Sequence, residues 1–494
     1  MDNDLLLGID LGTSVCKAGI YSRQGELINC THIEYGLIKE EGGIVEQDAS
    51  QWWDVALQAV KQSIRTAGID KNCIKALSVS SQGISFVPVD EGINPLCRSI
   101  NWLDTRAEKE AEIILEKIAF PEMFAITGKR IHSSYTLPKI LWFMRNKPEV
   151  VDKSYKFLMS HDFLIAKLTG ECLTDHTMAA GTLMYDISNL TWSEEIIGQF
   201  SIPMEKLPSI RWAGTSIGKI SRHIAQEIGL SSEILIVVGG QDQKCADLGA
   251  GLVEGVATLS LGTAVALTTM GSRPVIDKQM RIPCFPYLLR NRWVLEGVIS
   301  TGGGSLKWLK QIMNDTRYSY EKLIDMAKEA PLGAKGVFFF PHLVGATSPH
   351  WESKAKGVFY GLSLSTSTKD LVRSLLEGVA FQVKENLEIL EELTEEVKEI
   401  RVFGGGAKSK FWGEIIANVT GKRVYLLSSR EAATIGACVL AGVGSGVYKN
   451  YQEAVESLKN LSYMKVEPDI CVQKKYEELY LNYRKVEEKI LDII

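Results

Sequence analysis

The residue pattern with the clearest chemical meaning is a Gly-Thr turn that occurs twice. Asp10-Leu11-Gly12-Thr13-Ser14 lies between apolar runs near the start of the chain, and Leu261-Gly262-Thr263 lies between similar runs farther on. Two strands joined by such a turn expose backbone N–H groups and a hydroxyl at the tip, which suits phosphate oxygens. Two such hairpins facing one nucleotide indicate two related domains. The alternative is a pair of unrelated hairpins that share these residues by chance.

A carboxylate and a lysine accompany the first turn. Asp10 precedes the turn, and a carboxylate beside phosphate oxygens is repelled unless a cation bridges them, so Asp10 is the candidate Mg²⁺ ligand. Capping of the turn is the alternative role for Asp10. Lys17, farther along the same hairpin, is either a phosphate ligand or an ordinary surface lysine.

A second carboxylate follows a buried apolar run in the segment Gly239-Gly240-Gln241-Asp242-Gln243. In open α/β sheets, ligands bind beyond the carboxyl ends of the strands. Asp242 is therefore a candidate acceptor for the proton of a substrate hydroxyl that attacks a phosphoryl group. Gln243 is a candidate for a hydrogen bond to another hydroxyl of a polyol. The alternative is a glycine turn whose Asp satisfies backbone N–H groups.

A third segment, Gly404-Gly405-Gly406-Ala407, joins an expected strand to a helix that starts near Lys410. A glycine turn before a helix can lie flat against a nucleotide and direct its amides at phosphates. Such a turn is weak support by itself. The chain contains neither the G-x-x-x-x-G-K-[ST] motif nor the protein-kinase motifs.

Short apolar runs alternate with helical patterns along the chain, which predicts an α/β fold. The expected strands are Leu5–Asp10, Val15–Tyr21, Ala76–Ser80, Ile234–Val238, Gly336–Pro341 and Glu399–Phe403, and the expected helices are Ala49–Ala67, Thr368–Leu393 and Lys474–Ile494. Three glycines make Leu248–Ala257 flexible, and the domain boundary is placed there, giving domains 1–248 and 249–494. A chain of 494 residues is long enough for two cores.

The composition favours a small-molecule partner. The formal net charge of -5 argues against a nucleic-acid or anionic-membrane surface, and no apolar run is long enough to span a bilayer. The nine cysteines form no C-x-x-C pair, as expected for reduced thiols in a cytoplasmic protein. No signal peptide is expected at the start of the chain. A homodimer is one possible assembly.

Together these segments resemble the FGGY family of carbohydrate kinases. One family signature is similar to residues 134–146, and a second resembles residues 357–377 with Leu375 as an imperfect fit. The resemblance implies two ribonuclease-H-like, actin-like ATPase domains with the active site in the cleft between them. It also implies ATP and Mg²⁺ as cofactors, with Asp242 as catalytic base and Asp10 organising the metal. The phosphate and adenosine positions that it implies are Gly12, Thr13, Gly262, Thr263, Gly302, Gly303, Gly404, Gly405, Gly406 and Ala407.

Within that family the chain looks most similar to xylulokinases, but its sugar pocket is altered. Xylulokinases carry Met-His-Gly after the glutamine that corresponds to Gln82, whereas here the run is Gly83-Ile84-Ser85. The family's W-x-D-x-R pattern is kept at positions 102–106. Asp104 is therefore the best candidate to bind a sugar hydroxyl, with Gln82, Gly83 and Trp102 as further candidates. The alternative role of Gln82 is to brace the pocket, and the alternative place of Trp102 is the core.

The resemblance implies ATP-dependent phosphorylation of a primary hydroxyl of a pentulose such as xylulose. Another ketose or polyol, such as ribulose, erythritol or glycerol, is the alternative acceptor. A catalytically idle sugar-binding regulator and an actin-like or chaperone-like ATPase are the rival functions from other classes. His161, His342 and His350 are expected to be structural, because no signature assigns them a role.

Overall fold

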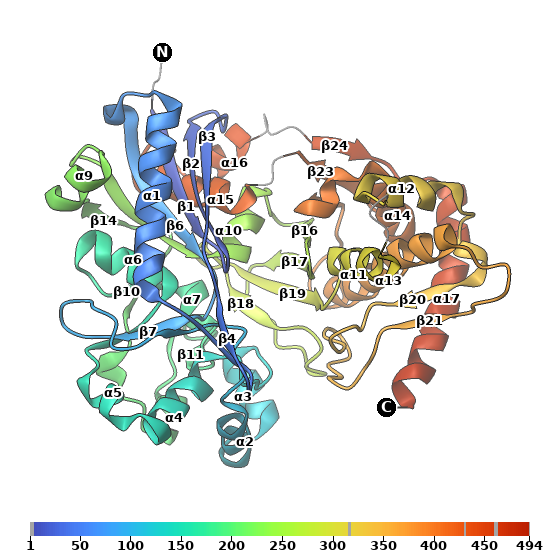
Figure 1. Ribbon diagram of the computed structural model, residues 1–494, viewed down its shortest axis with the longest axis horizontal. Coiled ribbons are helices and arrows are strands. Elements are labelled where there is room, and N and C mark those ends of the chain that lie inside the picture. Colours follow the sequence, from blue (N-terminus) through green and yellow to red (C-terminus); the bar gives the residue numbers. More distant parts are fainter. Residues whose placement is uncertain (1–3, 315–317, 429–430, 459–462, 494) are drawn as a thin grey trace.

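The N-terminal half of the chain is built on a six-stranded sheet (Figure 1). Its strands, in spatial order, are β14 (Ser216–Lys219), β15 (Leu235–Gln241), β6 (Ile74–Ser81), β1 (Leu5–Leu11), β2 (Val15–Ser22) and β3 (Leu27–Glu34). The strands β3, β2 and β1 form an antiparallel meander, and β1, β6 and β15 run parallel. The predicted strands at Leu5–Asp10, Val15–Tyr21 and Ala76–Ser80 are confirmed.

The C-terminal half repeats this topology in a seven-stranded sheet. Its strands, in spatial order, are β18 (Cys284–Pro286), β19 (Trp293–Ile299), β17 (Val265–Gly271), β16 (Val256–Leu261), β22 (Glu399–Phe403), β23 (Arg423–Leu427) and β24 (Tyr463–Val466). Here too an antiparallel meander, β19-β17-β16, continues into the parallel strands β22 and β23. The two Gly-Thr turns therefore occupy equivalent hairpins, β1–β2 and β16–β17.

Helices cover both sheets, and their bounds follow the apolar periodicity. In the N-terminal half the helices are α1 (Ala49–Ala67), α2 (Glu108–Lys117), α3 (Phe120–Thr127), α4 (Thr136–Asn146), α5 (Pro148–Lys153), α6 (Ser160–Thr169), α7 (His176–Ala180), α8 (Glu194–Gln199), α9 (Arg222–Ile228) and α10 (Asp242–Gly249). In the C-terminal half they are α11 (Gly303–Met313), α12 (Tyr320–Glu329), α13 (Thr368–Leu393), α14 (Lys410–Thr420), α15 (Ala432–Gly444), α16 (Tyr451–Ser457) and α17 (Ile470–Asp492). The predicted bounds of α1 and α13 are confirmed.

Smaller elements complete both halves. A five-stranded sheet below the first one contains β4 (Ile38–Glu40), β5 (Ile44–Gln47), β8 (Ser99–Ile100), β7 (Phe86–Val89) and β9 (Lys156–Met159). Three two-stranded pairs are β10 (Leu173–Asp175) with β13 (Ser209–Arg211), β11 (Tyr185–Asp186) with β12 (Thr191–Trp192), and β20 (Phe338–Phe340) with β21 (Val358–Tyr360). The strand predicted at Gly336–Pro341 is thus shorter than expected, because Ala334–Gly336 forms a 3₁₀ turn.

The computed structural model describes residues 4–314, 318–428, 431–458 and 463–493. Ile494, the predicted end of the terminal helix, lies outside these residues, and α17 starts at Ile470 rather than Lys474 because Asp469 caps it. At the start of α13, Ser367 and Asp370 form a capping box. Among the described residues, no helix is long and apolar enough to cross a membrane.

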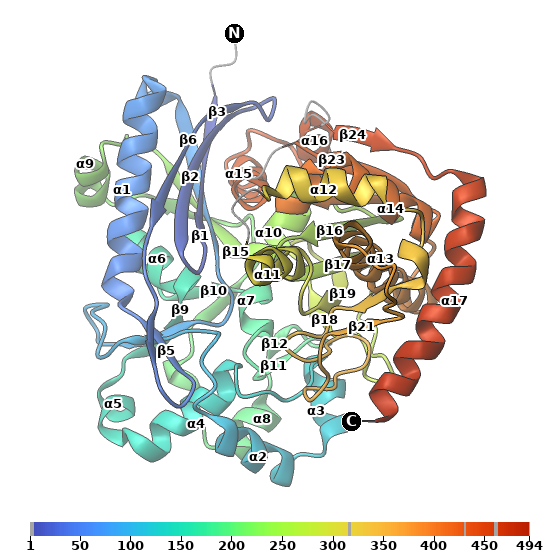
Figure 2. The same cartoon turned by 45° about the vertical axis from the view of Figure 1, so that its right-hand side comes forward.

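Helix α15 belongs to the C-terminal half of the sequence but packs in the N-terminal lobe. It follows the C-terminal sheet in the chain, yet it lies beside β1 and α10 of the N-terminal lobe (Figures 1 and 2). The hydroxyl of Tyr21 on β2 lies 2.8 Å from the hydroxyl of Thr434 on α15. A Cβ atom at Gly8 would lie 2.4 Å from the Thr434 carbonyl oxygen, so glycine at this position lets the helix approach the sheet. The N-terminal core is therefore completed by a late segment of the chain.

Candidate active site

The first Gly-Thr turn is held from several sides. The Gly12 N–H donates to the Val15 carbonyl (3.0 Å), which closes the turn between β1 and β2. Gln47 Nε2 donates to the Thr13 carbonyl (2.8 Å), and the Trp102 indole N–H donates to the Thr13 hydroxyl (2.9 Å). Trp102 is 39% exposed, so it is not a core residue. These contacts hold the Thr13 hydroxyl in one place at the tip of the hairpin.

Asp10 and Lys17 form a charged pair behind this turn, while Ser14 is exposed at its tip. The Ser80 hydroxyl donates to Asp10 Oδ1 (2.9 Å), and Lys17 Nζ lies 3.6 Å from Asp10 Oδ2 and 3.2 Å from Glu431 Oε2. Burial raises the pKa of Asp10 above its usual range, although Lys17 and Ser80 oppose this shift. Lys17 is thus directed at two carboxylates and is not an ordinary surface lysine.

The second turn is supported by the predicted glycines after β19. The Gly262 N–H donates to the Ala264 carbonyl (3.1 Å). The Gly302 N–H donates to the Thr263 carbonyl and the Gly303 N–H donates to the Gly262 carbonyl, both at 2.8 Å. A Cβ atom at Gly303 would lie 2.7 Å from the Gly262 oxygen. Glycine here lets the start of α11 pack directly on the hairpin.

A large cavity of about 1070 Å³ opens beside this second hairpin. Its walls come from the Gly262-Thr263 turn, Gly303, helices α12 and α14, and the turn containing Gly405 and Gly406. Gly404, at φ +89°, lets β22 turn sharply, and Ala407 is buried beneath the turn. A Cβ atom at Gly405 would meet nothing within 4 Å, so this backbone faces open space. Glycines of three predicted nucleotide-binding segments, at 262, 303 and 405–406, therefore meet at this cavity, whereas Thr13 of the first turn lines a different one.

A second, smaller cavity of about 290 Å³ lies between the lobes. Its lining includes Thr13 and Trp102 from the N-terminal lobe, Asp242 from the start of α10, and Phe285 from β18. Gly83, a predicted sugar-binding residue, also lines it. Because β15 runs through both glycines to Gln241, Asp242 stands directly at the carboxyl end of a parallel strand. The strand is longer than the predicted Ile234–Val238.

The electrostatics of Asp242 suit a proton acceptor at neutral pH. Burial raises the pKa of Asp242 to about 7, and the negative charge of Asp10 adds to the shift. The backbone N–H of Gln243 donates to Asp242 Oδ1 (2.8 Å), which stabilises the charged form and limits the shift. A carboxylate whose pKa lies near the working pH is an effective general base.

Two predicted sugar ligands, Gln82 and Gln243, are engaged elsewhere. Gln82 is 1% exposed; its Nε2 donates to Gln47 Oε1 (2.9 Å) and its Oε1 accepts from Asn101 Nδ2 (3.1 Å). Gln82 therefore braces the loop below Thr13, which was the alternative role. Gln243 Nε2 donates to Asp247 Oδ1 (3.0 Å), and Gln243 is not among the residues that line the small cavity.

The expectation that Asp104 binds a sugar hydroxyl is corrected by its surroundings. Asp104 has no exposed surface. Its Oδ2 accepts hydrogen bonds from the Val45 N–H (2.6 Å) and from Arg106 Nη2 (2.7 Å), and its Oδ1 accepts from Arg106 Nε (2.9 Å). Arg106 also pairs with Glu46 at 2.8 Å. The aspartate of the W-x-D-x-R pattern thus fixes the arginine and a neighbouring strand.

Three polar residues of the small cavity were not predicted: Gln241, Thr177 and Tyr135. The Gln241 N–H donates to the Thr177 hydroxyl (3.0 Å), while Gln241 Oε1 is buried and has no hydrogen-bond partner among the described residues. Its side chain packs over Gly83, where a Cβ atom would lie 3.1 Å from Gln241 Cγ. The position of Gln241 next to Asp242, at a strand end, is the signal that could have identified it.

The three histidines expected to be structural all have polar partners. His161 Nε2 accepts the Gly239 N–H at 3.3 Å and is fully buried. His342 Nε2 lies 2.9 Å from Glu487, and His350 Nε2 lies 3.7 Å from the same carboxylate. None of the three lines the small cavity.

Comparison with known proteins agrees with this architecture. Family models of the N-terminal and C-terminal domains of FGGY carbohydrate kinases match residues 5–249 and 257–445, respectively. The chain belongs to the FGGY family of carbohydrate kinases. The protein is accordingly an ATP-dependent sugar kinase with the actin-like ATPase fold, as the repeated sheet topology indicates.

Relatives of this kinase differ in their named substrates. A xylulose kinase from Staphylococcus epidermidis is 28% identical and covers 99% of this chain and 97% of its own. The structure of a gluconate kinase from Lactobacillus acidophilus has a TM-score of 0.92 at 26% identity, with 99% of this chain and 98% of that chain covered. The structure of a Plasmodium falciparum glycerol kinase with ADP has a TM-score of 0.88 at 25% identity, with 99% of this chain and 98% of that chain covered.

Proposed function

We propose that this kinase transfers the γ-phosphoryl group of ATP to a primary hydroxyl of a pentulose such as xylulose, with Asp242 as the catalytic base. The observation that carries the proposal is the small cavity that Asp242 shares with Thr13 of the first hairpin. A hydroxyl at the carboxylate and a phosphoryl group at the hairpin would thus occupy the same cavity. Such proximity is the main source of rate in phosphoryl transfer.

The two cavities match two ligands of unequal size. Small-molecule sites have volumes of roughly 300–1,000 Å³. The larger cavity, at about 1070 Å³, suits a nucleotide held by Gly262, Thr263, Gly405 and Gly406. The smaller one, at about 290 Å³, suits a single sugar or polyol. The two hairpins would then clasp the phosphates that reach from one cavity toward the other.

The residues near the first hairpin fit Mg²⁺. Asp10 and Asp242 are close enough for the charge of Asp10 to raise the pKa of Asp242, and a dication would relieve their mutual repulsion. Carboxylate oxygens are the ligands that Mg²⁺ prefers. Asp10 would help hold the ion, which when bound neutralises phosphate charge. Lys17 already contacts Asp10 and would limit its negative charge until the nucleotide arrives.

In the reaction, Asp242 orients the acceptor hydroxyl and takes its proton. The transition state of phosphoryl transfer is loose, so the proton moves late and positioning matters more than basicity. Phe285, from the C-terminal lobe, forms part of the cavity wall and would help to keep water from the phosphoryl group.

The walls of the small cavity bear on the choice of acceptor. Ile84, in a left-handed backbone conformation at φ +56°, presents an apolar side chain where xylulokinases carry an imidazole in the same segment. Gln241 and Tyr135 provide polar groups instead. A pentulose is favoured by the similarity to xylulose kinases. The altered wall supports another ketose or a polyol as the second candidate.

Sugar-dependent ADP release tests the proposal. The acceptors to screen are ketopentoses, ketohexoses, tetritols, pentitols and glycerol, with the Asp242→Ala variant as control. The proposal requires that xylulose or a related pentulose give the highest kcat/KM and that the control be inactive. ADP release that does not depend on any acceptor would instead identify an ATPase. Acceptor binding without ADP release would identify a regulator.

A further inference from the structure

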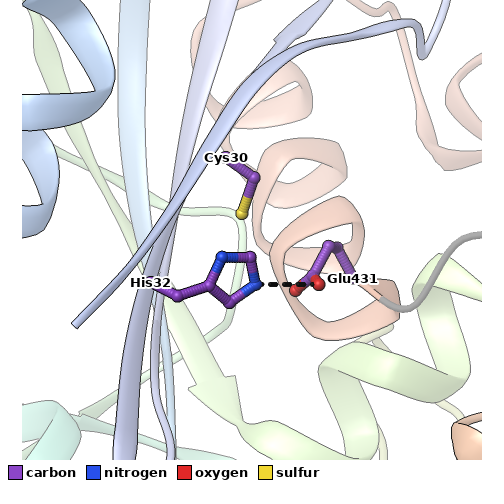
Figure 3. A group of neighbouring side chains, drawn as sticks. All are labelled: Cys30, His32 and Glu431. Carbon is purple, nitrogen blue, oxygen red and sulfur yellow. Dashed lines mark hydrogen bonds and ion pairs between the residues drawn. The ribbon is translucent and has the colours of Figure 1, made fainter. Parts of the chain in front are cut away.

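A cluster of three side chains lies outside the small cavity and has no role in the proposed reaction: Cys30, His32 and Glu431 (Figure 3). Cys30 and His32 belong to strand β3, and Glu431 immediately precedes helix α15. Alternate residues of a strand point to the same face, so the thiol and the imidazole project together toward α15. Asn29, on the opposite face of β3, contacts Ser63 of α1. The fold therefore brings donor groups from both ends of the chain to one point.

The geometry of the cluster is close to that of a metal site. The potential ligand atoms of the three residues all lie within 4.8 Å of one another, and His32 Nε2 is 3.0 Å from Glu431 Oε1. Zinc binds sulfur at about 2.3 Å and nitrogen or oxygen at about 2.0–2.2 Å, which places tetrahedral ligands about 3.5 Å apart. Small side-chain rotations would bring all three donors to these distances.

The donor types select the kind of ion. One sulfur, one imidazole nitrogen and one carboxylate oxygen suit Zn²⁺ and similar borderline cations. Mg²⁺ prefers oxygen ligands and octahedral geometry, so it fits the two aspartates of the active site and not this cluster. The two places would thus take different metals.

Access and charge also favour an ion. The His32 side chain is 47% exposed and Cys30 is partly exposed, so an ion and a fourth ligand from water can enter from solvent. Glu431 has two carboxylate oxygens: Oε1 faces His32, while Oε2 faces Lys17 at 3.2 Å. An ion can bind Oε1 without displacing Lys17 from Oε2. Coordination replaces the thiol proton of Cys30, which passes to the buffer.

We propose that Cys30, His32 and Glu431 form a binding site for one Zn²⁺-type ion, which fastens strand β3 to the start of helix α15. Water supplies the fourth ligand. The site shares no donor with the small cavity, although Glu431 Oε2 also contacts Lys17, which contacts Asp10. Because the ion joins segments distant in the chain, its binding stabilises the folded state.

A second cluster, His350, Glu385 and Glu487, provides an internal control. Its ligand atoms lie equally close together, but it offers no sulfur, and Arg484 Nη2 already lies 3.1 Å from Glu385. His350 lies between both carboxylates, which raise the pKa of this histidine to about 10 and keep it protonated. A protonated histidine does not bind a metal, so this cluster is not expected to compete.

The experiment titrates the full-length protein, without any added histidine tag and after treatment with a chelator, with Co²⁺ as a coloured substitute for Zn²⁺. We expect one equivalent to bind, with a thiolate-to-cobalt charge-transfer band, and we expect Zn²⁺ but not excess Mg²⁺ to bleach it. The Cys30→Ala and His32→Ala variants should lose the band and at least tenfold in affinity. Zinc should raise the Tm of the wild type only.

The matched controls are Cys471→Ala, which removes an exposed cysteine, and His350→Gln in the second cluster. Both should bind Co²⁺ like the wild type. A cobalt spectrum without a thiolate band, a band that survives in Cys30→Ala, or a Cys471→Ala variant that loses it would overturn the proposal. The circular dichroism of each variant verifies folding, and His32 is exposed enough for its replacement to be tolerated. No arm of this experiment depends on kinase activity.

Discussion

Replacing Asp242 with asparagine should make the protein more stable and nearly inactive at the same time. The pKa of Asp242 is about 7 in the folded protein, against 3.8 for an ordinary aspartate. Each unit of difference is worth about 1.4 kcal/mol, so ionising this buried carboxylate costs the folded state at most about 4 kcal/mol. Asp242 is partly exposed to the cavity, and screening by solvent there reduces the expected gain to about 1–2 kcal/mol.

The size of the stability difference changes with pH in a defined way, and its sign stays the same. Below pH 4 the carboxyl is protonated in both the folded and the unfolded protein, so wild type and Asp242→Asn should be equally stable. Between pH 4 and pH 7 the unfolded state loses its proton first, and wild-type stability falls relative to the variant. Above pH 7 the difference is constant, because both states are ionised.

Thermal unfolding without nucleotide or metal, measured from pH 4.5 to pH 8.5, tests this expectation. We expect the Tm of Asp242→Asn to exceed that of the wild type by about 2 °C or more at pH 8 and to converge with it toward pH 4.5. Sugar-dependent ADP release should fall about 10²–10⁴-fold, since asparagine cannot accept the proton. A variant that is less stable than the wild type at pH 8 would refute the argument from burial. A variant with unimpaired turnover would refute the role of the base.

Three further outcomes follow from the same structure. For wild type, kcat/KM for the acceptor should decrease tenfold per pH unit below pH 7, as one group protonates, and a flat profile from pH 5.5 to 8 would contradict this. Gln241→Leu should raise the acceptor KM about tenfold or more and leave the KM for ATP unchanged in steady-state assays. Gly436→Ala should lower both Tm and kcat, because the new Cβ atom would lie 1.9 Å from the Cys245 carbonyl oxygen of α10, the helix that starts with Asp242. The matched control is Gly405→Ala, whose Cβ atom has open space around it. This control should change only the KM for ATP.

Much of the fold could be predicted because its signals are local. Apolar periodicity gives the bounds of α1 and α13 directly, and the repeated Gly-Thr turn indicates two related domains. The predicted end of β15, at Val238, was wrong because two consecutive glycines normally terminate a strand. Here Gly239 continues it, since a Cβ atom would lie only 1.8 Å from the Val79 carbonyl oxygen of β6, and glycine is required for the two strands to approach.

The part of the candidate site that lies at strand ends and turns could be predicted from the sequence. The sugar-binding residues were predicted less well. Asp242 and Thr13 share a cavity, as their positions in the motifs indicate. Asp104 was misassigned because sequence spacing does not reveal which partner a carboxylate faces, and Arg106, two residues on, takes it. The bond between Gln82 and Gln47 joins segments distant in the chain. Such long-range pairing has no signal in a single sequence.

The position of helix α15 in the chain bears on how this protein folds during its synthesis. The sheet face around Gly8 is finished only when Thr434 packs against it, and Thr434 lies near the end of the chain. During synthesis the N-terminal lobe emerges first, and we expect its groove for α15 to stay open until nearly the whole chain has been made. Domains of most nascent proteins fold in order from the N-terminus. For this kinase we expect the two lobes to become native together, and a chain that ends before α15 to leave the core of its first lobe incomplete.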